Sequence, residues 1–514
     1  MDARWILVVA SLLLAGCVES GSDAGRPKAL RGDLEGAVPK APIPAEWAEL
    51  AVAGGEGHDH RDYLHHEGRS TSNFEVLAYD PLVTNYFGTT AGGHSCGDAN
   101  EVDGRKLAVV HSINNDVAFV LIDVTDSSAP RKLGELAMQN TQVYDVGLTP
   151  DQRYVIAATT PLGLGPGNVA VPLAATWEDA CTGETRIVDG PESGLPWAPG
   201  LVVVDIQNPQ NPLIVDSLFY PVLGGHSIRI SKIDGRTILL TAISGPPGYY
   251  AVAELTEVAD RAKLVPLSFY KYGPDDGAQA PELQTGGHDG FVQKHPVTGQ
   301  NLAYLAYGTL GLVIVDVTDL ASPEYVSRWN QWDQVGGGNH FFHGVLPMTE
   351  LRDGKHYTFA GEECSGRPAN YPTCLAYVFD TTDPATPKLV SAWSLPIEPE
   401  WREAAQFSAH YFDVVNGTLF IAMYHAGLWA IDISTPENLV RMPSIGAFVP
   451  FQASPKPPPT YGYGAPAVLD FIPLSDGSMV VFDRGAGVYT VRFDASNPAP
   501  SPEPWPVVNA TVLS

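Results

Sequence analysis

The stretch Leu312-Val313-Ile314-Val315-Asp316-Val317-Thr318-Asp319 decides the fold of this chain of 514 residues. It is a run of mostly apolar, β-branched residues that ends in aspartate, and Pro323 follows shortly afterwards. Such a run, bounded by Asp and Pro, predicts a buried strand that leads into a tight turn. The same pattern occurs at 120–126 before Pro130, at 201–206 before Pro209, at 376–383 before Pro384 and at 428–433 before Pro436. Weaker copies at 250–255 and 487–493 bring the total to about seven units.

A pair of strands joined by a tight turn precedes each of these runs. In one unit, the turn is Asp234-Gly235, between the β-rich segments 228–230 and 237–242. An Asp-Gly or Asn-Gly pair in this context predicts a β-hairpin. The signal returns at Asp103-Gly104, Asp353-Gly354, Asn416-Gly417 and Asp476-Gly477.

Repeated units of this size predict an all-β fold, a single β-propeller of about seven four-stranded blades. A single blade cannot bury both of its faces, so neighbouring blades must pack and one terminus must close the ring. We expect the segment 74–79 to be the strand that completes the last blade.

The run 312–316 spells the signature of the LVIVD-repeat proteins, and the chain resembles that family from about residue 90 to about residue 495. The resemblance implies a bacterial surface or secreted β-propeller and no single reaction. Two insertions, 161–200 and 363–374, depart from a uniform array. Specific functions are commonly added in such loops.

The first residues resemble a bacterial lipoprotein signal. Arg4 is followed by an apolar run from Trp5 to Leu14 and then by Ala15-Gly16-Cys17. A basic start, a short hydrophobic stretch and small residues before the cleavage point are typical of a signal peptide. The resemblance implies that Cys17 carries the lipid and that Val18 directs the protein to the outer membrane. We expect an exported protein anchored in the cell envelope, with a signal peptide at 1–17, a flexible tether at 18–72, a propeller at 73–497 and a tail at 498–514.

The net charge of −28 makes nucleic acid an unfavourable partner, because phosphate backbones are repelled. Cations are favoured, although a large acidic surface also serves solubility alone. Beyond the signal peptide, no apolar run is long enough to span a membrane, so the expected contact with the membrane is through the lipid. We expect a monomer.

The cysteines that remain after Cys17 are even in number, which in an exported chain predicts two disulfides. Cys364 with Cys374 would close a short loop, and Cys96 would then pair with Cys181.

Histidines recur where the first strand of each unit begins. First strands line the central channel of a propeller, so we expect these side chains to converge at one mouth. Neutral imidazole is a common ligand of zinc, copper and iron, and the pattern therefore predicts a site for a divalent or transition metal ion. The predicted ligands are His226, His288, His343 and His410, with His94, His340, Glu362 and His425 as further candidates; Tyr144 takes the place of the histidine in the second unit.

Loops between second and third strands open on the same face. Their side chains could complete a coordination sphere or orient a ligand from outside it. These are Asn114, Asp116, Glu362, Glu363, His425 and Asp483. The alternative weighs equally: a histidine repeated at one position can simply bond the backbone of the next blade.

The sequence contains no nucleophile elbow, Walker loop, dinucleotide-binding glycine motif or metalloprotease helix motif, so it indicates no catalytic residue. Two hypotheses for function remain open. The first is a metal-binding propeller that serves metal-dependent oxidoreductase chemistry. The second is a non-enzymatic recognition or scaffold propeller whose insertions 161–200 and 363–374 bind a protein or a glycan.

Overall fold

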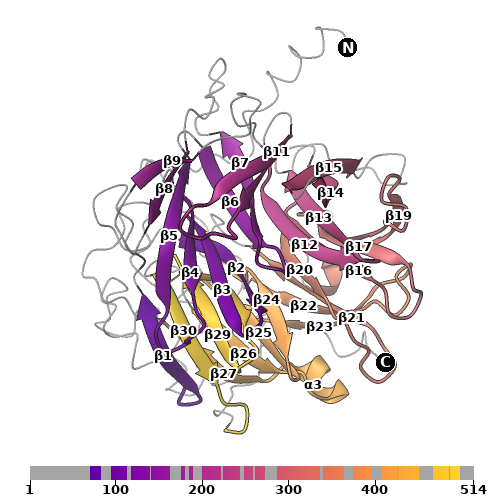
Figure 1. The fold of residues 1–514 in the computed structure, drawn as a ribbon. Helices are drawn as coiled ribbons and strands as arrows, with labels where there is room; N and C mark the ends of the chain where they lie inside the picture. Colours follow the sequence, from indigo (N-terminus) through magenta and orange to yellow (C-terminus); the bar gives the residue numbers. More distant parts are fainter. Residues whose placement is uncertain are drawn as a thin grey trace, which may run out of the picture.

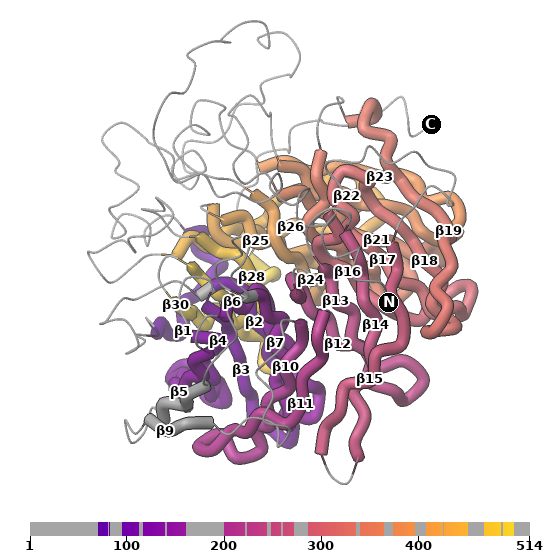
Figure 2. Tube along the Cα trace, turned by 90° about the horizontal axis from the view of Figure 1, so that it is seen from above, coloured from indigo at the N-terminus to yellow at the C-terminus, as the bar shows by residue number. Residues whose placement is uncertain are grey.

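Seven antiparallel sheets follow one another around a central axis in the computed structural model, and they form a β-propeller (Figures 1 and 2). The structure describes residues 70–80, 82, 94–112, 117–138, 141–161, 175–179, 185–188, 200–220, 224–243, 248–258, 261–271, 286–335, 340–363, 374–395, 408–424, 426–450, 467–484 and 487–497. Among these residues, no helix is long and apolar enough to cross a membrane.

The first three blades in chain order span the N-terminal half of the propeller. Blade 1 contains β2 (His94–Val102), β3 (Arg105–Ser112), β4 (Val117–Asp123), β5 (Arg131–Met138), β8 (Ala175–Asp179) and β9 (Thr185–Val188). Blade 2 contains β6 (Thr141–Leu148), β7 (Tyr154–Pro161), β10 (Gly200–Asp205) and β11 (Leu213–Phe219). Blade 3 contains β12 (Ser227–Ile233), β13 (Arg236–Ile243), β14 (Tyr249–Val258) and β15 (Arg261–Tyr270).

The remaining four blades complete the ring. Blade 4 contains β16 (Asp289–Lys294), β17 (Asn301–Ala306), β18 (Leu312–Asp316) and β19 (Glu324–Trp329), followed by the short 3-10 helix η4 (Trp332–Val335). Blade 5 contains β20 (Phe342–Pro347), β21 (Tyr357–Glu362), β22 (Ala376–Asp380) and β23 (Lys388–Trp393). Blade 6 contains β24 (Phe412–Val415), β25 (Thr418–Ala422), β26 (Leu428–Asp432), the helix α3 (Pro436–Arg441) and β27 (Ser444–Phe448). Blade 7 contains β28 (Val468–Pro473), β29 (Ser478–Asp483), β30 (Gly487–Phe493) and β1 (Phe74–Asp80).

The seven predicted blades are confirmed, with one difference in blade 1. That sheet has six strands, because β8 and β9, from the insertion between β7 and β10, add to the outer strand β5. The insertion therefore starts and ends in blade 2, but its two strands pair with blade 1 and widen that sheet.

The ring closes through β1, as the sequence predicts. β1 pairs antiparallel with β30, from Phe74 opposite Phe493 to Asp80 opposite Val488. Figure 1 shows indigo β1 beside yellow β30. The Phe74 ring lies 4.8 Å from that of Phe493 and 6.2 Å from that of Phe448 in the neighbouring blade. The closing strand thus joins the core between blades 6 and 7.

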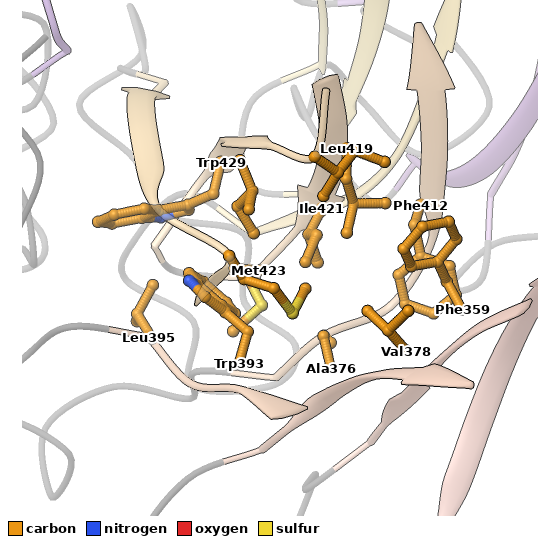
Figure 3. Close-up of a cluster of buried hydrophobic side chains, with 14 of the residues drawn as sticks. Phe359, Ala376, Val378, Trp393, Leu395, Phe412, Leu419, Ile421, Met423 and Trp429 are labelled. Carbon is orange, nitrogen blue, oxygen red and sulfur yellow. The ribbon is translucent and has the colours of Figure 1, made fainter. Parts of the chain in front are cut away.

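The LVIVD run has apolar residues at successive positions because both faces of its strand are buried. Val313 and Val315 pack into the core shared with blade 3. Leu312 and Ile314 pack into the core shared with blade 5. Figure 3 shows the corresponding core between blades 5 and 6, where Trp393 and Trp429 pack around smaller apolar side chains.

The aspartate that ends each run caps the turn that follows. Asp316 Oδ1 accepts a hydrogen bond of 2.8 Å from the backbone N–H of Thr318. An aspartate oxygen that accepts an amide two residues later stabilises such a turn. The same bond is present at Asp123, Asp205, Asp380 and Asp432. The repeated aspartates are therefore structural.

Candidate metal site at the mouth of the channel

The first strand of each blade lies innermost, and β2, β6, β12, β16, β20, β24 and β28 contact one another in turn around the axis. His226 and His288 come directly before β12 and β16, His343 is in β20, and His410 comes shortly before β24. Four successive blades thus each place one histidine at the same end of the channel. We call these four side chains the histidine row.

The members of the histidine row contact one another in sequence order. The Nε2 atoms of His226 and His288 are 3.0 Å apart. Ring centroids are 4.4 Å apart for His226 and His288, and 3.9 Å apart both for His288 and His343 and for His343 and His410. The Tyr144 ring lies 4.8 Å from His226 and continues the row into blade 2. The convergence predicted from the repeat is therefore present for these four histidines.

Glu363 adds a carboxylate to the row. It follows β21, and its Oε2 lies 3.7 Å from His288 Nε2 and 3.9 Å from His343 Nε2. The ligand atoms of His288, His343 and Glu363 all lie within 4.8 Å of one another. In a tetrahedral zinc site with the usual bond lengths, ligand atoms are about 3.3 Å apart. A small inward movement of the side chains would bring this group to that geometry.

Tyr424 holds the carboxylate from the side of blade 6. Its hydroxyl donates a hydrogen bond of 2.7 Å to Oε1 of Glu363, which leaves Oε2 directed at the imidazoles. The backbone of Tyr424 has a φ of 47°, in the left-handed region that a bulky residue rarely adopts. Strain of this kind is often found at functional sites.

All four histidines are held in the neutral form. Burial and the neighbouring His288 lower the pKa of His226 to about 3, and burial together with His343 lowers the pKa of His288 to about 3. Burial also lowers the pKa values of His343 and His410 well below the usual value. Neutral imidazole is the form that binds metal. The Nδ1 atoms of His288 and His343 are buried and have no hydrogen-bond partner within the described part of the chain.

A half-buried guanidinium lies on the first strand of blade 3, three residues after His226. Arg229 of β12 lies 3.0 Å from Asp289 and 3.7 Å from Asp145. It also stacks over the Tyr411 ring, 4.2 Å from its centroid. Burial raises the pKa of Asp145 to about 7, and Arg229 offsets part of that rise. Arg229 thereby links blade 3 to blades 2, 4 and 6 across the axis.

His340 and Glu362, two of the further predicted ligands, bond to each other instead of joining the row. His340 Nδ1 and Oε1 of Glu362 form a close hydrogen bond, and the Tyr377 hydroxyl donates to the same oxygen. Glu362 points away from its neighbour Glu363 because successive residues of an extended chain face opposite sides, and His340 lies with Glu362.

The other predicted residues lie elsewhere or outside the described residues. Asp483 ends β29, opposite Val468 at the start of β28, and accepts a hydrogen bond of 2.9 Å from the backbone N–H of Ala467. His94 begins β2, where the pairing with β3 is irregular between His94 and Gly97, and its side chain is not described. The residues that lie outside the described ranges are Asn114, Asp116, His425 and, in the signal and tether segments, Cys17.

The predicted disulfide between Cys96 and Cys181 is wrong, because Cys96 is a free, buried thiol. Cys96 lies on the inner strand β2, with its sulfur 3.9 Å from His410 Nδ1. The segment that leads to Cys181 instead pairs with β5, the outer strand of the blade. Cys181 itself lies outside the described residues, as does Cys364, so the pair Cys364 and Cys374 stays a prediction.

Sequence reasoning missed Arg229, Tyr411 and Tyr424. None of them repeats from unit to unit, so alignment of the units gives no signal for them. A charged arginine within a strand expected to line a channel was the one local hint at Arg229.

A known repeat family matches two stretches of the chain. Residues 197–218 and 297–331 match the LVIVD repeat. A putative 6-phosphogluconolactonase from Bacteroides fragilis NCTC 9343 is similar in structure, with a TM-score of 0.46, 10% identity, and 78% of this chain and 94% of that chain covered. The WD40 β-propeller domain of Doa1 has a TM-score of 0.43 and 9% identity, with 84% of this chain and 100% of that chain covered. No curated protein shows significant sequence similarity to this chain.

Proposed function

This chain is an LVIVD-repeat β-propeller with seven blades, and we propose that it binds a transition metal ion at the histidine row. The ligands we propose are His288, His343 and Glu363, with His226 next to them. His410 flanks the group, since its Nδ1 faces Cys96. One observation carries the proposal: neutral imidazoles from successive blades, one half-buried and one buried, meet a carboxylate at distances close to those of a metal site.

The donor set favours particular metals. Imidazole nitrogen with one carboxylate oxygen suits zinc, copper, iron or nickel, whereas calcium and magnesium prefer oxygen ligands alone. Copper or iron would supply one-electron chemistry, which is the basis for proposing metal-dependent oxidoreductase activity. The net charge of −28 supports cation binding by raising the local concentration of cations.

We further propose that the protein is exported and anchored by a lipid on Cys17. The support is the basic and then apolar start of the chain, which ends in Leu14-Ala15-Gly16-Cys17. Metal uptake would then occur in the cell envelope. Labelling with a radioactive fatty acid tests the anchor, and a Cys17→Ser variant should lose the label.

Elemental analysis of the purified mature protein after mild dialysis tests the metal site. We expect about one equivalent of metal in the wild type and strong loss of metal in His288→Asn and His343→Asn. His356→Gln is the matched control, because His356 is also buried in blade 5 but bonds Met348 and Thr381 at the opposite end of β21. A metal-free wild type, or unchanged uptake in both histidine variants, would contradict the proposal.

A recognition or scaffold function is the second candidate, favoured by the widening of blade 1. The hairpin of β8 and β9 adds an outer edge that no other blade has in the described structure. Binding of a protein or glycan there predicts that deletion of the insertion between β7 and β10 abolishes binding, while changes in the histidine row have little effect. The opposite result favours the metal site.

A further inference from the structure

The ends of β20 and β21 carry two histidine–glutamate pairs that face opposite ways. Phe342 pairs with Glu362 across the two strands, and the N–H of Glu363 donates a hydrogen bond of 3.2 Å to the carbonyl of Phe341. Glu363 and His343 face the histidine row. Glu362 and His340 face the other side. The position of each pair therefore depends on the other through a short stretch of shared backbone.

Glu362 is fixed by several contacts. His340 Nδ1 and the Tyr377 hydroxyl both bond its Oε1. The His340 ring stacks on Trp332 of η4, with centroids 4.7 Å apart and planes at 17°. Trp332 in turn donates from Nε1 to the carbonyl of Thr309 in blade 4, at 3.3 Å. The unit of His340, Glu362, Tyr377 and Trp332, which we call the glutamate clamp, thus ties blade 5 to blade 4.

Three of the four residues of the glutamate clamp are almost completely buried. Glu362 and Tyr377 are 0% exposed and His340 is 3% exposed. Oε2 of Glu362 is also buried, without a hydrogen-bond partner among the described residues. Burial of a carboxylate is costly, and replacement of such a group by a neutral one is often neutral or stabilising for the fold. Stability alone therefore gives little reason for a carboxylate here.

The geometry points to a positioning function. We infer that the glutamate clamp fixes how closely Glu363 and His343 can approach a metal ion, and that it thereby determines the affinity of the site for metal. The inference rests on the metal-binding function proposed above. Phe341 follows His340 directly in the chain, and its ring lies edge-on to His288 at 5.7 Å. Mutation of a residue that orients a metal ligand without touching the metal typically lowers the affinity for metal by about 10–100-fold.

The test is metal affinity in Glu362→Gln, measured by competition with a chelator on the full mature protein. Gln keeps the shape and one acceptor but removes the charge that holds His340. We expect binding of Zn²⁺ or Co²⁺ to weaken about 10–100-fold, while the thermal midpoint of the metal-free protein stays the same or rises. The visible spectrum of bound Co²⁺ should also shift, because the ligand geometry relaxes.

Two further variants make the result decisive. Tyr377→Phe removes one hydroxyl and is the substitute test if Glu362→Gln does not fold. We expect it, too, to weaken metal binding. His356→Gln removes a buried histidine at the other end of β21 and should lower the thermal midpoint with affinity and Co²⁺ spectrum unchanged. If the wild type binds metal and both clamp variants keep wild-type affinity and spectrum, the positioning function is wrong and the metal site stands. If the wild type binds no metal, both proposals are wrong.

Discussion

Nε2 of His226 lies 3.0 Å from Nε2 of His288, so two nitrogens from neighbouring blades share one hydrogen bond at the mouth of the channel. Both rings are neutral, since burial holds their pKa values at about 3. One nitrogen must donate its proton and the other must accept it. A metal ion that binds both Nε2 atoms takes the place of this proton, which moves to Nδ1 of the ring that donated it, so that both imidazoles remain neutral.

The lowered pKa values predict metal binding that tolerates mild acid. Protons compete with metal for an imidazole mainly at pH values near or below its pKa, about 6.5 for an exposed histidine. For His226 and His288 that value is about 3, so both stay neutral as the pH falls from 7 to 5. We expect less than about a threefold change in affinity over this range. Chelator competition at pH 7, 6 and 5 measures it, and a tenfold loss per pH unit would show that the imidazoles titrate normally.

Tyr424→Phe should weaken metal binding by about tenfold, because Glu363 loses the hydrogen bond that directs its Oε2 to His288 and His343. The ring and its packing remain, so the thermal midpoint of the metal-free protein should change little. Competition with a chelator measures the metal affinity of this variant as well. Affinity equal to the wild type would mean that Glu363 is held without Tyr424.

Arg229→Met should destabilise the propeller by about 3–5 kcal/mol at neutral pH, because Asp145 and Asp289 keep their buried charges without a cation. Burial already raises the pKa of both carboxyls above the unfolded value, and loss of the cation raises it further. The folded state then binds more protons than the unfolded state, so the deficit should shrink as the pH falls from 7 toward 5. Denaturant unfolding at both pH values measures this, and Asp289→Asn added to Arg229→Met should restore part of the stability. If the loss in unfolding free energy does not depend on pH, it comes from lost packing and not from the unpaired carboxylates.

Phe74→Ala should weaken the packing of β1, the strand that closes the propeller. Phe74 is buried against Phe448 and Phe493, and removal of such a ring costs about 3–5 kcal/mol. We expect a lower thermal midpoint and faster hydrogen exchange in β1 and β30 than in blade 4. Val76→Ala is the control, since Val76 in the same strand is 41% exposed. Equal effects of both changes would contradict a closing function for Phe74.

The blades could be predicted in detail because their signals are local. Four of the predicted hairpin turns have positive φ at both central residues, as at Asp234 and Gly235, which is the geometry that Asp-Gly favours. The capping aspartates likewise need only the amide two residues away, as at Asp316. The site was predicted in part, because the histidines share one position in the repeat and the repeat places that position at the axis.

Residues that do not repeat could not be assigned in this way. Glu362 and Glu363 are neighbours in the sequence, yet one lies in the glutamate clamp and the other faces the histidine row. Cys96 was assigned a disulfide by counting cysteines, and its position on an inner strand overturns that pairing. An irregularity between His94 and Gly97 also alters which residues of β2 face the channel, and unit alignment does not detect it.

By itself, the sequence determined the strands, the turns and the number of blades, because each depends on short apolar runs and on bonds between residues close in the chain. Only the tertiary structure decided which side chains meet. The contacts of His226 with His288, of Glu363 with Tyr424 and of Arg229 with Tyr411 each join different blades. Such contacts are set when the ring closes and each blade packs on the next, and the packing register between blades is not a local property of the chain.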